Sequence, residues 1–269
     1  SLLAGMYYHA ALYDSALVMY ETMHRIKQEP STLTGIARLR EYLGKKREAL
    51  DALRMLIDQG ELSKENLTGA AKLALAEGDT GQALGYAVRA LEIDPQERGM
   101  LRFAAQISRA KDEREQEAGY LRRLALVDST GTGILRELAT ASRASGDRIT
   151  IIWALERLYR LDPSDSETLG ELAENLLADG ETARAEQLVK RGLETSPKDG
   201  RLHIILGEIH RGRGEAGRAA AEYRIALSDP RWEESARHFL QRLEHPETAT
   251  EKKEREFFGR GKKSGKTDR

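Results

Sequence analysis

Apolar and small residues are interspersed with charged ones in two helical segments of residues 172–197, LAENLLADGETARAEQLVKRGLETSP. The first segment contains Ala173 and ends near Gly180, and the second contains Ala185 and ends before Pro197. The same layout recurs 34 residues later as LGEIHRGRGEAGRAAAEYRIALSDP and 34 residues earlier as LATASRASGDRITIIWALERLYRLDP. This periodicity predicts a repeated helix–turn–helix unit.

Four series of positions keep this spacing along the chain. Small residues in the first helix of each unit are Ala4, Ala37, Ala71, Ala105, Ala139, Ala173 and Gly207. The turn positions are Ala11, Gly44, Gly78, Asp112, Gly146, Gly180 and Gly214. The second-helix positions are Ala16, Ala49, Ala83, Glu117, Ile151, Ala185 and Ala219. The closing positions are Pro95, Ser129, Pro163, Pro197 and, one residue early, Pro230. Small residues let helices approach closely, glycine ends the first helix at positive φ, and proline stops the second.

This pattern resembles the tetratricopeptide repeat, a helix–turn–helix unit of about 34 residues. The resemblance covers residues 1 to about 230, and residues 73–95, LALAEGDTGQALGYAVRALEIDP, are close to the family consensus. It implies an all-α fold: a right-handed α-solenoid of about seven helix pairs, whose first helices line a concave groove.

The repeats predict the following organisation. Units are expected at about 1–30, 31–63, 64–96, 97–131, 132–164, 165–198 and 199–230. A lone helix at 231–244 is expected to cap the last pair, so that the solenoid spans 1–244. Residues 245–269 are polar and basic, and we expect this tail to be disordered. The paired aromatics Phe257 and Phe258 within it are either a docking motif or packed against the cap.

The fourth unit departs from the pattern at Glu117, which stands where a small residue is expected. An unpaired carboxylate at a packed helix contact costs on the order of several kcal/mol. Two arrangements avoid that cost: the helix rotates to turn Ala118 inward, or Glu117 pairs with a cation. We also expect a looser or bent joint around residues 110–131.

The beginning of the chain is unusual for a repeat array. Ser1 falls inside a predicted first helix with no capping residue before it. We therefore hypothesise that more chain precedes it in the natural protein. The exposed first unit is also expected to permit self-association, because helical-repeat arrays need capping units at their ends.

Composition narrows the choice of partner only slightly. The formal net charge is −1, so bulk charge predicts neither a nucleic-acid nor a membrane partner. The sequence has no cysteine, which excludes disulfides, thiolate metal sites and cysteine nucleophiles. It has no run of about 18 apolar residues, so no transmembrane segment is expected. The compartment, cytoplasmic or periplasmic, stays open.

Several motifs lack the context that their chemistry requires. Residues 212–217, GRGEAG, fit a dinucleotide-binding fingerprint but follow a helical stretch instead of a strand. Residues 261–267, GKKSGKT, suggest a phosphate-binding loop but follow no strand and end with the chain. His203 and His210 lie seven residues apart on one predicted helix without a metal-binding motif. We therefore expect no cofactor, no metal site and no enzymatic activity.

Arginines gather where the groove is expected. Arg102 and Arg109 lie two turns apart on one helix, and Arg136 and Arg143 repeat this arrangement in the next unit. Arginine suits bidentate capture of carboxylates, so an acidic segment or a C-terminal carboxylate is the expected ligand. The alternative is that these arginines are ordinary solvated charges. The predicted partner-binding groove consists of Arg38, Lys72, Arg102, Gln106, Arg109, Arg136, Thr140 and Arg143.

The function predicted from these features is a non-enzymatic scaffold or adaptor. It would bind a protein or peptide partner in the groove and help to assemble a multiprotein complex. One alternative is a regulatory or targeting domain of a larger enzyme, such as a glycosyltransferase. A second alternative, an RNA-binding helical-repeat protein, is opposed by the strict 34-residue spacing and the neutral net charge, so no nucleic-acid partner is expected.

Overall fold

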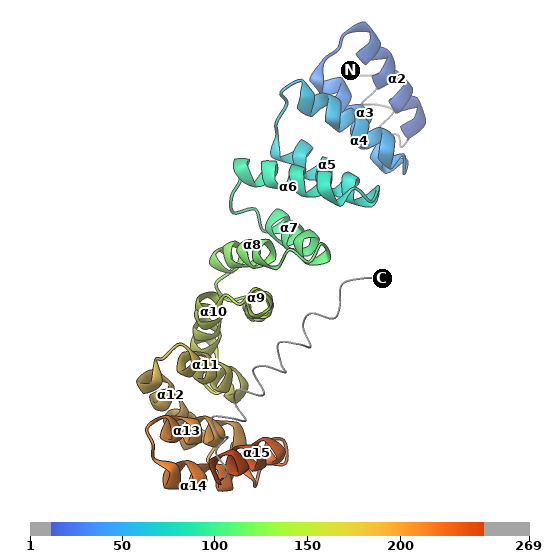
Figure 1. Cartoon of the computed structure of the whole chain (residues 1–269). Coiled ribbons are helices and arrows are strands. Elements are labelled where there is room, and N and C mark those ends of the chain that lie inside the picture. Colours follow the sequence, from blue (N-terminus) through green and yellow to red (C-terminus); the bar gives the residue numbers. More distant parts are fainter. Residues whose placement is uncertain (1–11, 245–269) are drawn as a thin grey trace, which may run out of the picture. The chain divides into compact units, whose positions relative to one another are not determined.

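The computed structural model describes residues 12–244, and all regular elements in this range are α-helices (Figure 1). The fold is therefore an all-α helical repeat. The first helix of the first predicted unit and the tail at 245–269, with Phe257 and Phe258, lie outside the described residues. The chain divides into two compact units, residues 1–147 and residues 148–269, which are taken in turn.

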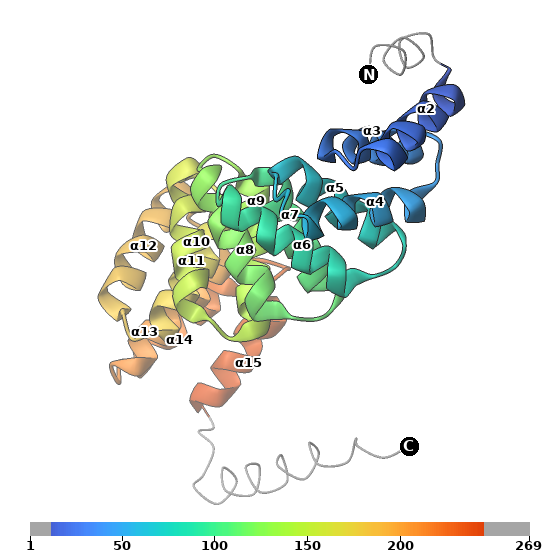
Figure 2. The ribbon, with the colours of Figure 1, turned by 90° about the horizontal axis from the view of Figure 1, so that it is seen from above.

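The first unit is a chain of antiparallel helix pairs in which each helix packs on the next (Figures 1 and 2). Its helices are α2 (Tyr13–Ile26), α3 (Pro30–Tyr42), α4 (Lys46–Asp58), α5 (Lys64–Ala76), α6 (Thr80–Ile93), α7 (Arg98–Ala110), α8 (Arg114–Val127) and α9 (Thr132–Ser145). In the repeat pattern α3, α5, α7 and α9 are first helices, and α4, α6 and α8 are second helices.

The second unit continues the same construction and ends with a single helix. Its helices are α10 (Arg148–Leu161), α11 (Ser166–Ala178), α12 (Thr182–Thr195), α13 (Gly200–Gly212), α14 (Ala216–Ala226) and α15 (Glu233–Glu244). Helix α15 packs on both α13 and α14. Its Phe239 ring stacks on Tyr223 with ring centroids 5.4 Å apart, so this helix covers the apolar side of the last pair.

Small residues make the close helix contacts that the repeat pattern predicts. Ala71, Ala83 and Ala185 are completely buried. Gly207 of α13 faces the ring of Tyr223, and a methyl group at this position would overlap that ring. Because the Tyr223 side chain is itself fully buried, α13 and α14 reach this separation only with glycine at position 207.

The turns between first and second helices share one backbone conformation. The prediction that glycine ends the first helix at positive φ is confirmed at Gly44, Gly78, Gly146, Gly180 and Gly214. In the fourth unit Asp112 takes this place with φ of +60°. Aspartate tolerates the left-handed region better than most side chains, which explains how the repeat keeps its turn there without glycine.

Glu117 is buried and paired with two cations. Its side chain is only 1% exposed, and it accepts hydrogen bonds from Arg109 Nε at 2.5 Å and Arg114 Nη1 at 3.1 Å. Of the two arrangements expected for this position, pairing with a cation is thus the one observed, although Ala118 is buried beside it. Helix α8 is uninterrupted from Arg114 to Val127. Looser behaviour of residues 110–131 remains a prediction for hydrogen exchange.

Alanine substitution at two glycines separates backbone strain from packing. A Cβ at Gly78 or at Gly85 would meet nothing within 4 Å, but Gly78 has φ of +84° and Gly85 lies inside α6. We expect Gly78→Ala to lower the free energy of unfolding by about 1 kcal/mol and Gly85→Ala to raise it by about 0.5–1 kcal/mol. Chemical denaturation measures both changes, and equal signs would contradict the assignment of strain to the turn.

A double-mutant cycle tests the pairing of Glu117. We expect Arg109→Ala to lower the free energy of unfolding by about 1–2 kcal/mol. This loss is smaller than the one expected on breaking a fully buried ion pair, because the Arg109 side chain is 47% exposed and Arg114 still pairs with Glu117. In a Glu117→Ala background the same substitution should cost under about 0.5 kcal/mol. Equal costs in both backgrounds would show that the two side chains are not coupled.

Candidate functional site

The predicted groove residues occupy the first helices of the first unit. Helices α3, α5, α7 and α9 carry Arg38, Lys72, Gln106 and Thr140 at equivalent positions, and all four side chains are exposed. We call the exposed surface of these helices the first-helix face. Regular spacing on equivalent helices therefore places one solvent-facing row on this face.

A cleft of about 490 Å³ opens on this face between α5 and α7. It brings together three of the predicted residues, Lys72, Arg102 and Gln106. We call it the first-helix cleft, and its lining residues are Thr68, Lys72, Glu97, Arg98, Gly99, Met100, Arg102, Phe103, Gln106, Leu124, Asp128 and Ile134. Its size falls within the usual range for a ligand-binding cleft.

Most charges that line the first-helix cleft are engaged within the protein. Arg98 Nη2 pairs with Asp128 Oδ2 at 3.3 Å. Glu97 accepts a hydrogen bond from the Met100 amide at the beginning of α7. Lys72 is exposed and makes no ion pair or side-chain hydrogen bond within residues 12–244. Lys72 is thus the cation of this cleft that has no carboxylate of its own.

Arg102 and Arg109 are brought together by a carboxylate on the neighbouring first helix. Glu137 of α9 lies between them, with Oε1 3.3 Å from Arg102 Nη1 and Oε2 3.3 Å from Arg109 Nη2. Arg109 also supports the buried Glu117. Both arginines therefore hold helices together within this unit, and a ligand carboxylate would compete with Glu137 for them.

The remaining predicted residues extend the face without lining the cleft. Arg38 is exposed on α3 and has no ion-pair partner in the described part of the chain. Arg136, Thr140 and Arg143 are exposed on α9. The Thr140 hydroxyl donates to the Arg136 carbonyl at 2.9 Å, within its own helix.

Two residues of the site were not anticipated from the sequence. Phe103 lines the cleft next to Arg102, and Glu137 joins the two arginines. Each directly follows a predicted arginine in the sequence. A comparison of the residues next to the predicted arginines in successive repeats could therefore have identified them. The sequence pattern does not show which rotamers bring these side chains into contact.

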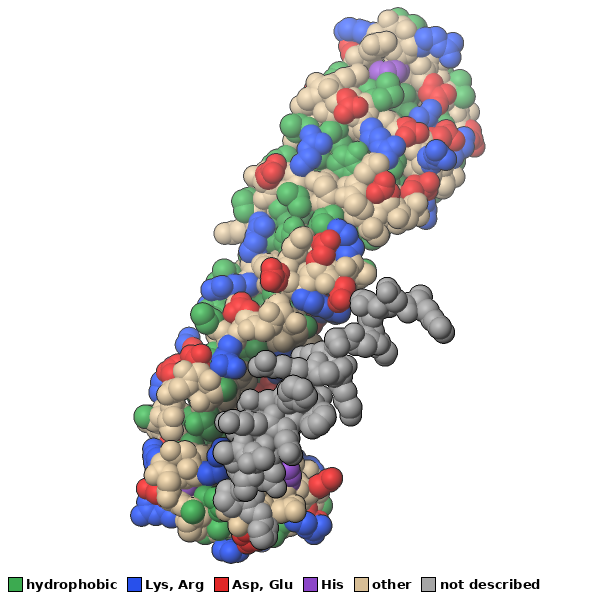
Figure 3. Space-filling model, in the orientation of Figure 1, with side chains coloured by type: hydrophobic (Ala, Val, Ile, Leu, Met, Phe, Trp, Pro, Cys, Tyr) green, Lys and Arg blue, Asp and Glu red, His purple; other side chains and the backbone are tan. Residues whose placement is uncertain are grey.

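Charges of both signs mix over the visible surface instead of forming one large patch (Figure 3). A long-range electrostatic field is therefore weak, as the net charge of −1 implies. A charged ligand would therefore be attracted by individual side chains that form no ion pair within residues 12–244, such as Lys72 and Arg38.

The histidines singled out in the sequence have structural partners. His203 is 6% exposed, with Nδ1 2.7 Å from Glu222 Oε2 and Nε2 3.0 Å from the Pro197 carbonyl oxygen. His210 Nδ1 lies 2.6 Å from Glu215 Oε2. Within residues 12–244 no group of three or more potential ligands is placed to hold a metal ion. No helix in this range has the length and apolarity that crossing a bilayer requires.

Comparison with known proteins identifies the repeat. Residues 144–227 match the tetratricopeptide-repeat family model, and no curated protein matches the sequence. A chain in the structure of Naa15/Naa10 bound to HypK-THB aligns with 14% identity and a TM-score of 0.63, over 99% of this chain and 42% of that one. At this identity the likeness shows the fold alone.

Two other solved structures of repeat proteins align less closely. A tetratricopeptide repeat protein from Parabacteroides merdae has 17% identity and a TM-score of 0.47, over 90% of this chain and 96% of that one. YrrB, described as having an unusual peptide-binding site, has 15% identity and a TM-score of 0.48, over 70% and 97% of the two chains.

Proposed function

We propose that this chain, which matches the tetratricopeptide-repeat family model over residues 144–227, is a non-enzymatic scaffold that binds a protein or peptide partner on the first-helix face. Helical repeats present extended surfaces of this kind to their partners. The observation that supports this site is the first-helix cleft, where Lys72 lies beside apolar residues and forms no ion pair with any described residue. The partner would contribute an acidic segment or a C-terminal carboxylate and thereby join a multiprotein complex.

The chemistry of the cleft supports a mixed acidic and apolar ligand. Among the lining residues, Phe103 is half-buried, and Met100 and Ile134 are almost fully buried. An apolar side chain of the partner would gain from leaving water against this lining. A carboxylate on the same segment would reach Lys72, and Arg38 would extend the contact along the face. Apolar lining gives affinity, and a few polar groups give orientation.

The roles of the arginines decide which variants are informative. Reversing the charge of Arg109 would place a third carboxylate near Glu117 and Glu137 and would destabilise the helix packing. Loss of binding in such a variant would not locate the site. Lys72 and Arg38 have no internal partner within residues 12–244, so reversing their charges tests the surface without this complication.

Affinity capture from a native extract tests the proposed face. We expect Arg38→Glu with Lys72→Glu to lose a partner that the unaltered chain retains, because two cations become anions opposite an acidic segment. The matched control is Lys46→Glu with Arg47→Glu, the same charge change at exposed positions on α4. Retention by both variants, or loss from both, would contradict the proposal. Arg136→Glu with Arg143→Glu then asks whether the partner reaches α9.

The competing carboxylate gives an independent test once the acidic segment is known. We expect Glu137→Gln to tighten its binding several-fold, on the order of 1 kcal/mol, because Arg102 and Arg109 lose an internal partner. Fluorescence anisotropy with the labelled segment measures the dissociation constant. Glu115→Gln on α8 is the control. An unchanged or weaker affinity in Glu137→Gln would remove these two arginines from the proposed site.

A further inference from the structure

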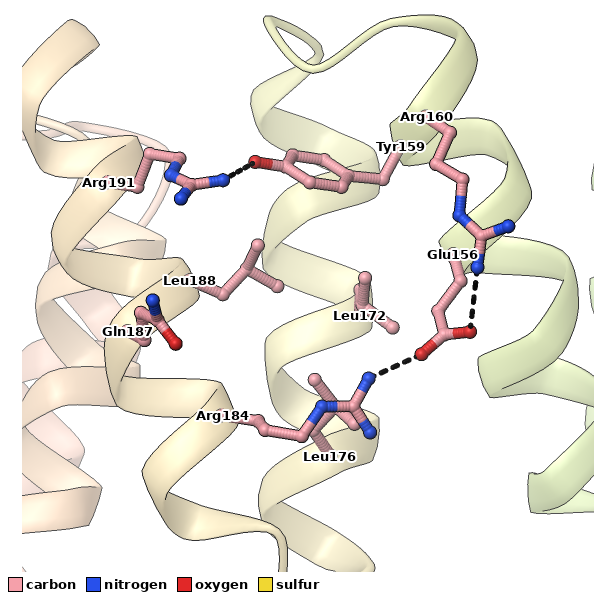
Figure 4. A pocket seen from close by; sticks show the side chains of 9 residues that line it. All are labelled: Glu156, Tyr159, Arg160, Leu172, Leu176, Arg184, Gln187, Leu188 and Arg191. Atoms are coloured by element: carbon pink, nitrogen blue, oxygen red, sulfur yellow. Dashed lines mark hydrogen bonds and ion pairs between the residues drawn. The ribbon is translucent and has the colours of Figure 1, made fainter.

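A second cleft, of about 310 Å³, lies in the second unit (Figure 4). It runs between the second helices α10 and α12, with α11 beneath it. We call it the second-helix cleft, and its lining residues are Glu156, Tyr159, Arg160, Leu172, Leu176, Arg184, Gln187, Leu188 and Arg191. None of them belongs to the first-helix face.

Leucines line the middle of this cleft. Leu172 and Leu176 of α11 lie between the two flanking helices, and Leu188 extends toward them from α12 (Figure 4). The volume is near the lower limit for ligand pockets, about 300 Å³. It therefore suits one or two side chains of a peptide and not a folded domain.

Polar side chains of α10 and α12 meet at the two ends of the leucine floor (Figure 4). At one end Glu156 Oε1 pairs with Arg184 at 2.5 Å, and its Oε2 lies 3.6 Å from Arg160. Arg184 is also held by Glu181 at 2.5 Å. The carboxylates at this end are therefore already used by arginines of the protein.

Arg191 occupies the other end, beside Tyr159. Its Nη1 donates to the Tyr159 hydroxyl oxygen at 3.4 Å, a long contact to a neutral group. It forms no ion pair within residues 12–244. The lining thus holds three arginines against one glutamate. Arg191 lies beside the apolar floor, with Glu194 near it on α12 but no ion pair to it.

We propose that the second-helix cleft binds an acidic peptide segment of a partner protein. One apolar side chain of the segment enters between Leu172, Leu176 and Leu188. A neighbouring Asp or Glu carboxylate accepts two hydrogen bonds from Arg191, whose planar fork matches it. This site is independent of the proposed first-helix face. The protein would therefore bind two segments at once and connect the two partner proteins that contain them.

A defined peptide and the full-length chain test this proposal. The probe is fluorescein-labelled Gly-Glu-Glu-Leu-Phe-Glu-Glu-Gly, and its comparison peptide carries Ser-Ser in place of Leu-Phe. Fluorescence anisotropy gives both affinities. We expect the comparison peptide and the Arg191→Glu variant each to weaken binding at least about tenfold. Arg224→Glu on α14, an exposed arginine of the same unit with no ion pair among the described residues, should change it less than about twofold.

Further variants make each outcome decisive. Lys72→Glu should leave the Arg191-dependent part of probe binding unchanged, which separates this site from the first-helix face. Leu188→Asp should weaken binding while thermal unfolding shows that the chain stays folded. Equal weakening by Arg191→Glu and Arg224→Glu would indicate general charge attraction and overturn the proposal. Undiminished binding of the Ser-Ser peptide, or no binding of the probe at millimolar concentration, would overturn it as well.

Discussion

Close approach of neighbouring helices is the constraint on which this structure depends. A 34-residue helix pair has a thin apolar layer and is stable only against its neighbours. Completely buried alanines such as Ala83 and Ala185 let those neighbours approach. The contact at Gly207 is especially close, because the Tyr223 ring fills the space where a side chain would begin. The positive-φ turns, of which Gly180 is one, then return each second helix onto the first.

Glu117 stands at a repeat position where most other units have a small residue. Close helix packing at this position therefore depends on a side chain of the candidate site. The buried carboxylate needs cations, and it takes one from the first-helix face, Arg109. Through Glu137 that arginine is connected to Arg102 and to the next first helix. At the proposed site, Arg102 and Arg109 would thus serve both stability and recognition, whereas Lys72 and Arg38 form no ion pair within residues 12–244.

The two clefts share a construction although they lie on different helices. Each has an apolar lining contributed by neighbouring helices, and each contains one cation, Lys72 or Arg191, that forms no ion pair in the described part of the chain. A mixed distribution of charge favours this design, because most ionic groups satisfy one another locally. At the proposed sites, the few that remain would confer selectivity for an acidic segment without a strong overall field.

The sequence by itself determined the class of fold, the repeat unit and the conformation of the turns. A 34-residue period in small residues suffices for this, since helix geometry fixes which positions face a neighbour. It also placed Arg38, Lys72, Gln106 and Thr140 at equivalent exposed positions. Only the tertiary structure decided that Glu137 lies between Arg102 and Arg109 and that Arg191 forms no ion pair within residues 12–244. Those contacts depend on side-chain rotamers and on the offset between helices some 30 residues apart, which a periodic pattern of residue types does not encode.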